Sequence, residues 1–252
     1  GNTLTRFEQG IRCIYPYRIH VIENDIYASK NKQYSVGVEL SGTGYISKEE
    51  KICFNKVIGN RIHEANEGVP GSANGGIHLN FFAHHNLIQN NVVTKNGIGI
   101  YLENYCDNNV IDGNISSYNR GYYGVGIECD WNCHNNTITN NTCEYNNGSL
   151  ESFESCGIQV RSGISSGEHI INNTIVSNNK CRFNGQTGIY LSGMNSICTG
   201  NICEGNGTNA AFEYASDILI IDARNSIVSN NVVFGNSPKF NIVILSSEKV
   251  MF

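Results

Sequence analysis

Glu128 and Asp130 are separated by one residue and are followed by Trp131, the only tryptophan of the chain. Alternate side chains of a β-strand point to the same face, so in a strand the two carboxylates would lie side by side, with Cα atoms roughly 6.6 Å apart. Crowded carboxylates raise the pKa of one partner, which suits general acid–base chemistry. The segment is therefore a candidate for proton transfer, provided that it forms a strand with this face outward.

Composition favours strands over helices and excludes two classes of partner. The 252 residues include 38 Asn but only 8 Ala and 9 Leu, and the apolar residues are mostly Ile, Val, Cys, Tyr and Phe. With a net charge of −5 and 15% charged residues, the chain lacks the basic face of a nucleic-acid-binding protein. No apolar run approaches the roughly 18 residues of a membrane-spanning helix.

An internal repeat organises the chain around asparagine. Eight copies align on one residue, at Asn24, Asn60, Asn91, Asn114, Asn141, Asn179, Asn201 and Asn231. In the last six copies a second asparagine follows five residues later, at Asn96, Asn119, Asn146, Asn184, Asn206 and Asn236. The shortest spacing between copies, 22 residues from Asn179 to Asn201, is about the length of one three-strand turn. The pattern indicates stacked turns whose corners carry ladders of Asn amides, in left-handed backbone geometry that Asn tolerates.

A second anchor precedes each asparagine and reads Gly-Ile-x-Leu, as in "GIHL" at 76, "GIYL" at 99 and 188, and "GIEC" at 126, with a degenerate "ILII" at 218. A leucine-rich repeat is the alternative, but that repeat follows its Asn with a helical turn, and here polar residues and a second Asn follow. With both anchors the chain resembles the right-handed parallel β-helix (pectate-lyase-like) superfamily over residues 10–245. The resemblance implies an all-β, right-handed parallel β-helix of about eight to nine turns, forming one domain over residues 1–252. It also implies an elongated, often carbohydrate-binding side face.

The ends of the predicted solenoid show no recognisable cap. Strand-like sequence, "FNIVILSSEKVMF", continues to the last residue. Because solenoid ends need covering, we expect flanking domains of a longer chain or a homo-oligomer to cover them.

The ten cysteines are predicted to be buried thiols. Cys143, Cys181 and Cys203 share one inward repeat position, and free Cys behaves as a small apolar residue. A Cys181–Cys203 disulfide between adjacent turns is the alternative, and the spacing of Cys129, Cys133 and His134 is a weaker metal pattern.

With Ile and Leu inward, the anchor strand presents two outward columns. The first comprises Arg12, Glu39, His78, Tyr101, Glu128, Gln159, Tyr190 and Ile220. The second comprises Ile14, Ser41, Asn80, Glu103, Asp130, Arg161, Ser192 and Asp222. Long loops at 41–54, 66–75, 147–156, 162–172 and 207–217 predict walls around an open floor at residues 101–130. The candidate catalytic residues are Glu103, Glu128, Asp130, Arg161 and His78. The candidate substrate-binding residues are Tyr101, Trp131, Tyr190, Gln159 and Asn80.

Three reactions on a polysaccharide suit such a groove. Two carboxylates could hydrolyse a glycosidic bond. The resemblance also implies β-elimination, with calcium held by Glu103, Glu128 and Asp130 and with Arg161 or His78 as the base. C5 epimerisation is implied too, although "YGVGIECD" lacks the Asp-Pro-His element of such enzymes.

Two alternatives involve no catalysis. One is a structural or adhesive β-helix of a cell or virion surface, similar to a tail spike, that only binds glycan. The other is an ordinary solvated face. Catalysis on a polysaccharide and glycan binding both imply an extracellular, cell-surface or virion-surface location. The remaining histidines, His20, His63, His84, His85, His134 and His169, show no convergent pattern.

Overall fold

The structure is a computed structural model that describes residues 1–7, 9–28, 35–42, 52–65, 75–148, 155–162, 170–209, 212–235 and 239–252. Within these ranges the chain contains strands and turns and no helix. Consequently the described residues include no helix long and apolar enough to cross a membrane.

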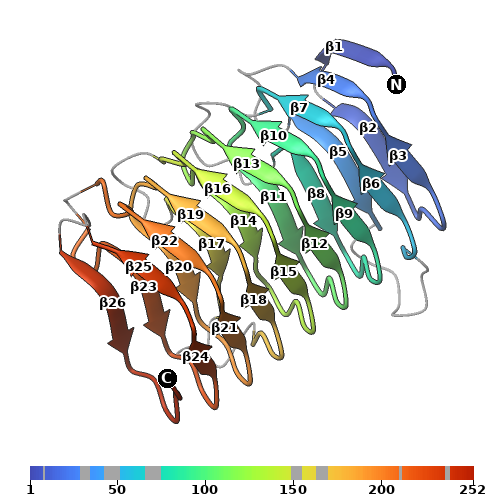
Figure 1. The fold of residues 1–252 in the computed structure, drawn as a ribbon. Helices are drawn as coiled ribbons and strands as arrows, with labels where there is room; N and C mark the ends of the chain where they lie inside the picture. The colour runs from blue at the N-terminus through green and yellow to red at the C-terminus, as the bar shows by residue number, and fades with distance from the viewer. Residues whose placement is uncertain are drawn as a thin grey trace.

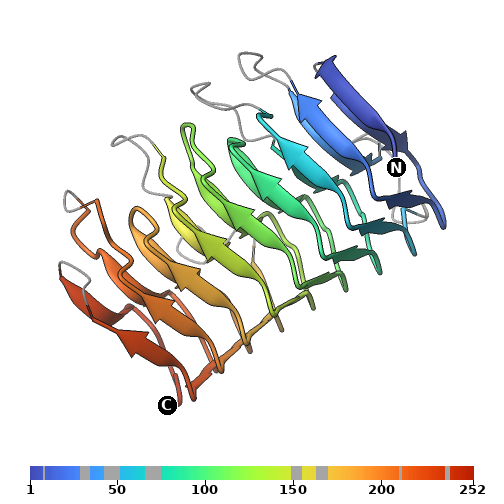
Figure 2. The same cartoon turned by 45° about the horizontal axis from the view of Figure 1, so that its top comes forward.

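In the part of the chain that the structure describes, successive turns contribute strands to three parallel sheets of nine, nine and eight strands, and the turns stack into an elongated solenoid with its termini at opposite ends (Figures 1 and 2). The first sheet contains β1 (Thr3–Phe7), β4 (Asp25–Ala28), β7 (Arg61–His63), β10 (Val92–Thr94), β13 (Ile115–Ser117), β16 (Thr142–Glu144), β19 (Lys180–Arg182), β22 (Ile202–Glu204) and β25 (Val232–Phe234). The second, called the site sheet below, contains β2 (Gln9–Ile14), β5 (Val36–Ser41), β8 (Ile77–Asn80), β11 (Ile98–Glu103), β14 (Val125–Cys129), β17 (Cys156–Val160), β20 (Thr187–Leu191), β23 (Ser216–Ile221) and β26 (Phe240–Leu245). The third contains β3 (His20–Ile22), β6 (Lys56–Ile58), β9 (Leu87–Gln89), β12 (Val110–Asp112), β15 (Thr137–Thr139), β18 (Ile175–Ser177), β21 (Ile197–Thr199) and β24 (Ile227–Ser229). The prediction of an all-β parallel solenoid of eight to nine turns is confirmed.

The core fills the space between the three sheets with inward side chains of every turn. In the site sheet, Ile100 of β11 pairs with Ile127 of β14, and both side chains are fully buried. The anchor glycine lies beside this core: a Cβ at Gly126 would come within 2.4 Å of the Gly157 carbonyl oxygen and 2.8 Å of Asn146 Nδ2. The close stacking of one turn on the next therefore requires glycine where the strand packs against a corner asparagine.

The predicted asparagine ladder is continuous. At each step from Asn24 to Asn231, the backbone N–H and the side-chain Nδ2 of one Asn both donate to Oδ1 of the next, over 2.9–3.0 Å. The second ladder runs in the same way from Asn96 through Asn119, Asn146 and Asn184 to Asn206. Its predicted last member, Asn236, lies outside the described residues. These bonds satisfy the polar groups of corners that are otherwise buried.

The left-handed backbone of each corner is in a different residue from the one predicted. In the first ladder the positive φ angle belongs to the residue before the Asn, at Glu23, Gly59, Asn90, Gly113, Asn140, Asn178, Gly200 and Asn230. The ladder Asn itself is drawn inward by its hydrogen bonds, whereas the preceding residue makes the sharp turn and points to solvent. The corner therefore needs a left-handed residue followed by a buried side-chain acceptor.

A third ladder, which the repeat alignment missed, joins the site sheet to the third sheet. It passes through Asn55, Asn86, Asn109 and Asn136 with the same paired hydrogen bonds, at 2.9–3.2 Å. Thr174, Ser196 and Ser226 continue the column with hydroxyl groups. The sequence signal was present, because Asn follows "AHH", "CDN" and "CHN" in three consecutive turns.

One strand is displaced by a residue from its predicted register. Tyr190 pairs with Leu219, and Leu191 pairs with Ile220, so Ile220 points into the core rather than outward. Asp217 takes the place of the anchor glycine, and its Oδ1 accepts hydrogen bonds from Asn206 N (3.1 Å) and Nδ2 (2.8 Å). The carboxylate thus ends the second ladder, which a pattern search for glycine overlooks.

The cysteine column is stacked as predicted. Cys143 pairs with Cys181 and Cys181 with Cys203, and all three side chains are fully buried. All ten cysteines are described as free thiols, and Cys13 is the one that is not buried.

This burial predicts the reactivity of the thiols. In the native protein a thiol reagent should label Cys13 first, whereas the other nine cysteines should react only after denaturation, because buried thiols are inaccessible to the reagent. Thiol counting with and without denaturant checks this. Rapid native labelling at most sites would contradict the stacked arrangement.

Candidate functional site

Five neighbouring strands of the site sheet bring the predicted residues together. His78 of β8 pairs with Tyr101 of β11, and Tyr101 pairs with Glu128 of β14. The column continues through Gln159 of β17 to Tyr190 of β20. In the second column Asn80 pairs with Glu103. Asp130 and Arg161 directly follow this column on the next two turns, since Asp130 N donates to Leu102 O and Arg161 N donates to Cys129 O, both over 3.0 Å.

The open floor predicted at residues 101–130 is wrong, because its central side chains are covered. Tyr101, Glu128 and Asp130 are only 3%, 2% and 3% exposed. Tyr123 and Tyr190 pack against the cluster that contains Tyr101. The predicted wall segments 43–51, 66–74, 149–154 and 163–169 lie outside the described residues. The carboxylates therefore occupy a buried polar cluster instead of an exposed groove floor.

Asp130 and Arg161 form the principal ion pair of this cluster. Asp130 Oδ2 accepts hydrogen bonds from Arg161 Nη2 (2.7 Å) and Nε (3.2 Å), and Oδ1 accepts one from the backbone N–H of Trp131 (2.7 Å). Burial raises the pKa of Asp130, although Arg161 and these hydrogen bonds lower it. Burial alone would lower the pKa of Arg161, but the charges of Glu128 and Asp130 outweigh it and raise that pKa. Arg161 is thus held as a cation beside Asp130, and its predicted role as the base of an elimination stays a prediction.

Glu128 contributes a buried, unsatisfied oxygen to the cluster. Its Oε2 is buried and has no hydrogen-bond partner within the part of the chain that the structure describes. Burial, and then the charge of Asp130, raise the pKa of Glu128 from 4.5 to about 8, against the lowering effect of Arg161. Glu128 is therefore largely protonated at neutral pH and can donate a proton, as a general acid does.

This raised pKa predicts a pH-dependent stability. Between the ordinary value near 4.5 and the folded value of about 8, the folded protein holds a proton that the unfolded chain has lost. Stability should therefore fall as pH rises through this window, by roughly 2–5 kcal/mol relative to Glu128→Gln. Urea midpoints of both proteins at about pH 5 and about pH 8 measure the difference. An equal change of the urea midpoint with pH in the two proteins would show that Glu128 titrates near its ordinary pKa.

His78, Tyr101 and Glu103 form the neighbouring part of the cluster. The His78 and Tyr101 rings stack with centroids 5.1 Å apart and planes 10° apart. His78 Nε2 lies 3.2 Å from Glu103 Oε2. Burial, followed by the charges of Glu128 and Glu103, raises the pKa of Tyr101 well above its ordinary value. Tyr101 is thus a neutral phenol, and the stacked His78 fixes its orientation.

The other predicted binding residues lie at the margin of the cluster. Gln159 is buried beside Glu128 in register, and Tyr190 is half-buried, with burial raising its pKa to about 12. Asn80 Oδ1 accepts from Phe81 N (2.8 Å) and Asn104 Nδ2 (2.9 Å). Trp131 lies beyond the strand and is 38% exposed.

The backbone directly after the cluster is strained on three consecutive turns. Two successive residues have positive φ at each place, including Phe81 and Phe82 at +48° and +64° and Trp131 and Asn132 at +52° and +62°. Large aromatic residues adopt this region reluctantly, at a cost of order 1–3 kcal/mol each, and such strain clusters at functional sites. Here the positive φ angles turn aromatic side chains outward, just beyond the strands that carry the buried cluster.

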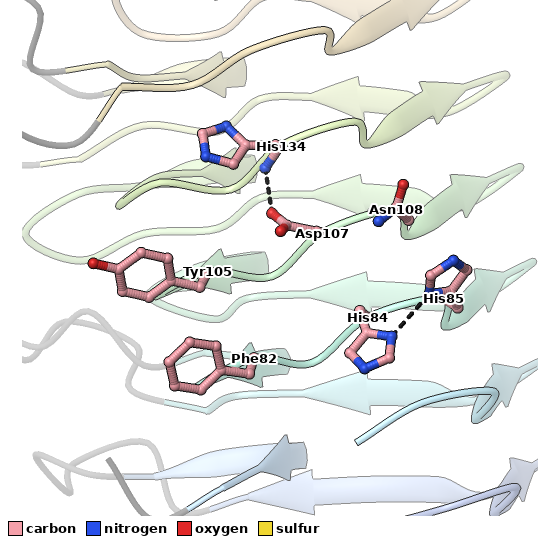
Figure 3. Close-up of a pocket in the computed structure, with 7 residues that line it drawn as sticks. All are labelled: Phe82, His84, His85, Tyr105, Asp107, Asn108 and His134. Atoms are coloured by element: carbon pink, nitrogen blue, oxygen red, sulfur yellow. Dashed lines mark hydrogen bonds between the residues drawn. The ribbon is translucent and has the colours of Figure 1, made fainter. Parts of the chain in front are cut away.

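Sequence reasoning missed a pocket on the same turns. A cavity of about 400 Å³ is lined by Phe82, His84, His85, Tyr105, Asp107, Asn108 and His134 (Figure 3). The prediction that His84, His85 and His134 show no convergent pattern is therefore wrong. The missing signal was the third ladder, because His84, Asp107 and His134 each stand two residues before one of its asparagines.

The arrangement does not fit the calcium site that the resemblance implied. Among the described residues, no group of three or more His, Cys, Asp or Glu side chains is placed to hold a metal ion. Asp130 is paired with Arg161, and Glu128 favours its protonated form. Calcium at Glu103, Glu128 and Asp130 stays a prediction for a chelator experiment.

Comparison with known proteins identifies the architecture. A family model described as "Right handed beta helix region" matches residues 1–175, more than half of the chain. The chain belongs to the right-handed β-helix family. No curated protein sequence matches it significantly.

Solved structures of this β-helix type cover nearly the whole chain at low identity. The chain is similar to an alginate lyase from Paenibacillus sp. str. FPU-7, with 13% identity, 95% of this chain and 99% of the lyase covered, and a TM-score of 0.54. It is also similar to the Dettilon tailspike protein, with 12% identity, 96% of this chain covered and a TM-score of 0.50. The chain spans 61% of the length of that tailspike. At these identities the similarities show the fold alone.

Proposed function

We propose that this β-helix protein acts on a polysaccharide by acid–base chemistry at the buried cluster around Glu128. The supporting observation is Glu128, whose Oε2 has no hydrogen-bond partner among the described residues and whose pKa is raised to about 8, directly beside the Asp130–Arg161 ion pair. Two carboxyl groups whose environments separate their protonation states are the arrangement that divides acid and base roles. Crowded, desolvated carboxyl groups of this kind are more often functional than structural.

In the proposed reaction Glu128 donates a proton to the departing glycosidic oxygen. Asp130, held by Arg161 through two hydrogen bonds, acts as the base: it takes a proton from the water that attacks the anomeric carbon, so that the bond to the leaving oxygen breaks as the bond to water forms. Tyr101, held against His78, supplies a neutral hydroxyl beside Glu128. Glycoside hydrolysis needs these groups and no metal, and it is the reaction that we favour over elimination. The proposal places the protein outside the cell or on a cell or virion surface, where such polymers occur.

The burial of the cluster favours a second candidate, glycan binding without catalysis. Side chains at most 3% exposed cannot contact a polymer unless the cover over them opens. Exposed aromatic residues such as Trp131 and Tyr105 would then carry the binding, as in an adhesive or tailspike-like protein.

Incubation with a panel of neutral and acidic polysaccharides distinguishes these functions. Hydrolysis yields new reducing ends without the ultraviolet absorbance of an unsaturated uronate, and it should continue in chelator. Elimination yields that absorbance, and chelator should abolish it if calcium is required. Retention on an immobilised glycan with no product from any polymer would support binding alone and would exclude the enzymatic proposal.

A further inference from the structure

The pocket beyond the cluster has the form of a separate ligand site. Its aromatic part consists of Phe82 and Tyr105, whose rings stack with centroids 5.1 Å apart and planes 11° apart. Tyr105 is 44% exposed, so part of its ring remains open to a ligand. In the view of Figure 3 these rings lie on one side, the His84–His85 pair lies on the other, and Asp107 lies between them. An aromatic surface with a few convergent polar groups is typical of small-ligand sites.

Asp107 contributes one free acceptor to the pocket. Its Oδ1 accepts the backbone N–H of His134 over 2.6 Å, and this bond fixes the carboxylate (Figure 3). No other hydrogen bond of this carboxylate occurs within the described ranges of the chain. Burial raises the pKa of Asp107, whereas the His134 N–H and the nearby imidazoles lower it. The second oxygen is therefore available to a hydroxyl group.

The imidazoles supply both donors and acceptors. His84 Nδ1 lies 2.8 Å from His85 Nδ1, so in the neutral pair one ring donates and the other accepts. The two Nε2 atoms are then one donor and one acceptor. His134 Nδ1 accepts the backbone N–H of Asn172 over 3.2 Å, which leaves Nε2–H as a donor in the neutral ring. Burial, and then the proximity of His85, lower the pKa of His84, so His84 favours its neutral form.

We infer that this pocket binds an uncharged, hydroxyl-rich sugar ring, with one face on Tyr105 and hydroxyl groups on Asp107 and the imidazoles. Hydroxyl groups donate and accept at once, and the pocket offers balanced donors and acceptors. A carboxylate-bearing sugar would instead meet the negative charge of Asp107. The inference goes beyond the proposed function, because it requires binding at the pocket and no chemistry at Glu128.

Titration of the full chain with methyl glucoside, followed through the imidazole signals in ¹H–¹⁵N spectra, tests the inference. Methyl glucoside should shift the signals of His84, His85 and His134 at neutral pH with a dissociation constant of order millimolar. Methyl glucuronide, which differs by one carboxylate, should bind at least about tenfold more weakly. No shift up to about 100 mM glucoside, or equal binding of both sugars, would overturn the inference.

Variants locate the binding and separate it from the cluster. Tyr105→Ala and Asp107→Asn should each weaken glucoside binding about tenfold or more. Asp107→Asn keeps an oxygen for the His134 N–H, so it serves where Tyr105→Ala fails to fold. Tyr145→Ala, which removes a ring of similar exposure from another column, should leave binding unchanged, as should Glu128→Gln. Unchanged binding in both pocket variants, or equal loss in Tyr145→Ala, would show that the sugar binds elsewhere.

Discussion

Glu128→Gln lowers the turnover of the polysaccharide substrate by about 10²–10⁴-fold, the range that a general acid contributes. Glutamine keeps the shape of the side chain but has no proton to give to a leaving oxygen. Asp130→Asn also lowers turnover, because it removes the carboxylate charge that pairs with Arg161 over 2.7 Å. Initial rates on the polymer identified in the panel, at the pH optimum of the wild type, measure both effects.

The control for this experiment is Glu144→Gln, which removes a carboxylate of the same turn from β16, in another sheet. It should leave turnover unchanged within about twofold, since surface substitutions away from a site have small effects. The melting temperature of Glu128→Gln at neutral pH should equal or exceed that of the wild type, because Gln has no carboxyl group to ionise in the buried site. Wild-type rates in Glu128→Gln would refute its role as the acid.

Asn141→Ala destabilises the solenoid by about 3–4 kcal/mol. The Asn141 side chain donates to Ile111 O and Asn179 Oδ1, and its Oδ1 accepts from the N and Nδ2 of Asn114. Alanine removes all four hydrogen bonds and leaves buried groups of two neighbouring turns without partners. The shift of the urea midpoint, with the slope of the transition as a check on cooperativity, measures the loss.

Asn140→Gly is the matched control on the adjacent residue. Asn140 has φ +55° and a side chain whose bond to Asp112 Oδ1 is exposed. Glycine adopts this angle without strain, so the free energy of unfolding should change by less than about 1 kcal/mol. Equal losses in the two variants would mean that the ladder contributes no more than the turn itself.

Most of the fold could be predicted from the sequence because the repeat constrains every turn in the same way. Asn at one position must bond to Asn of the next turn, and the inward and outward parity of the site strand follows from Ile and Leu. This parity placed Glu128, Asp130 and Arg161 together correctly. The predicted outward orientation of Ile220 was wrong. Asp217 replaces the anchor glycine of this strand, so the Gly-Ile-x-Leu pattern does not fix its register.

The state of the site could not be predicted by the same means. Strand parity tells which face a side chain points to, but it does not tell what lies over that face, and Glu128 proved to be buried. Its burial decides its pKa, which no spacing rule supplies. The histidines were overlooked because their alignment across turns depends on the third ladder, whose members change from Asn to Thr and Ser after Asn136.

Direct titration of the Glu128 carboxyl carbon by ¹³C NMR, assigned by comparison with Glu128→Gln, tests the central claim without knowledge of the substrate. The account predicts that Glu128 titrates near pH 8, far above its ordinary value of 4.5, because it is buried beside Asp130. Replacing Asp130 with Asn should lower this value, because the charge of Asp130 contributes to the rise. A Glu128 carboxyl that titrates near 4.5 and is indifferent to Asp130→Asn would show a solvated acid on an ordinary surface, and the assignment of this site would be wrong.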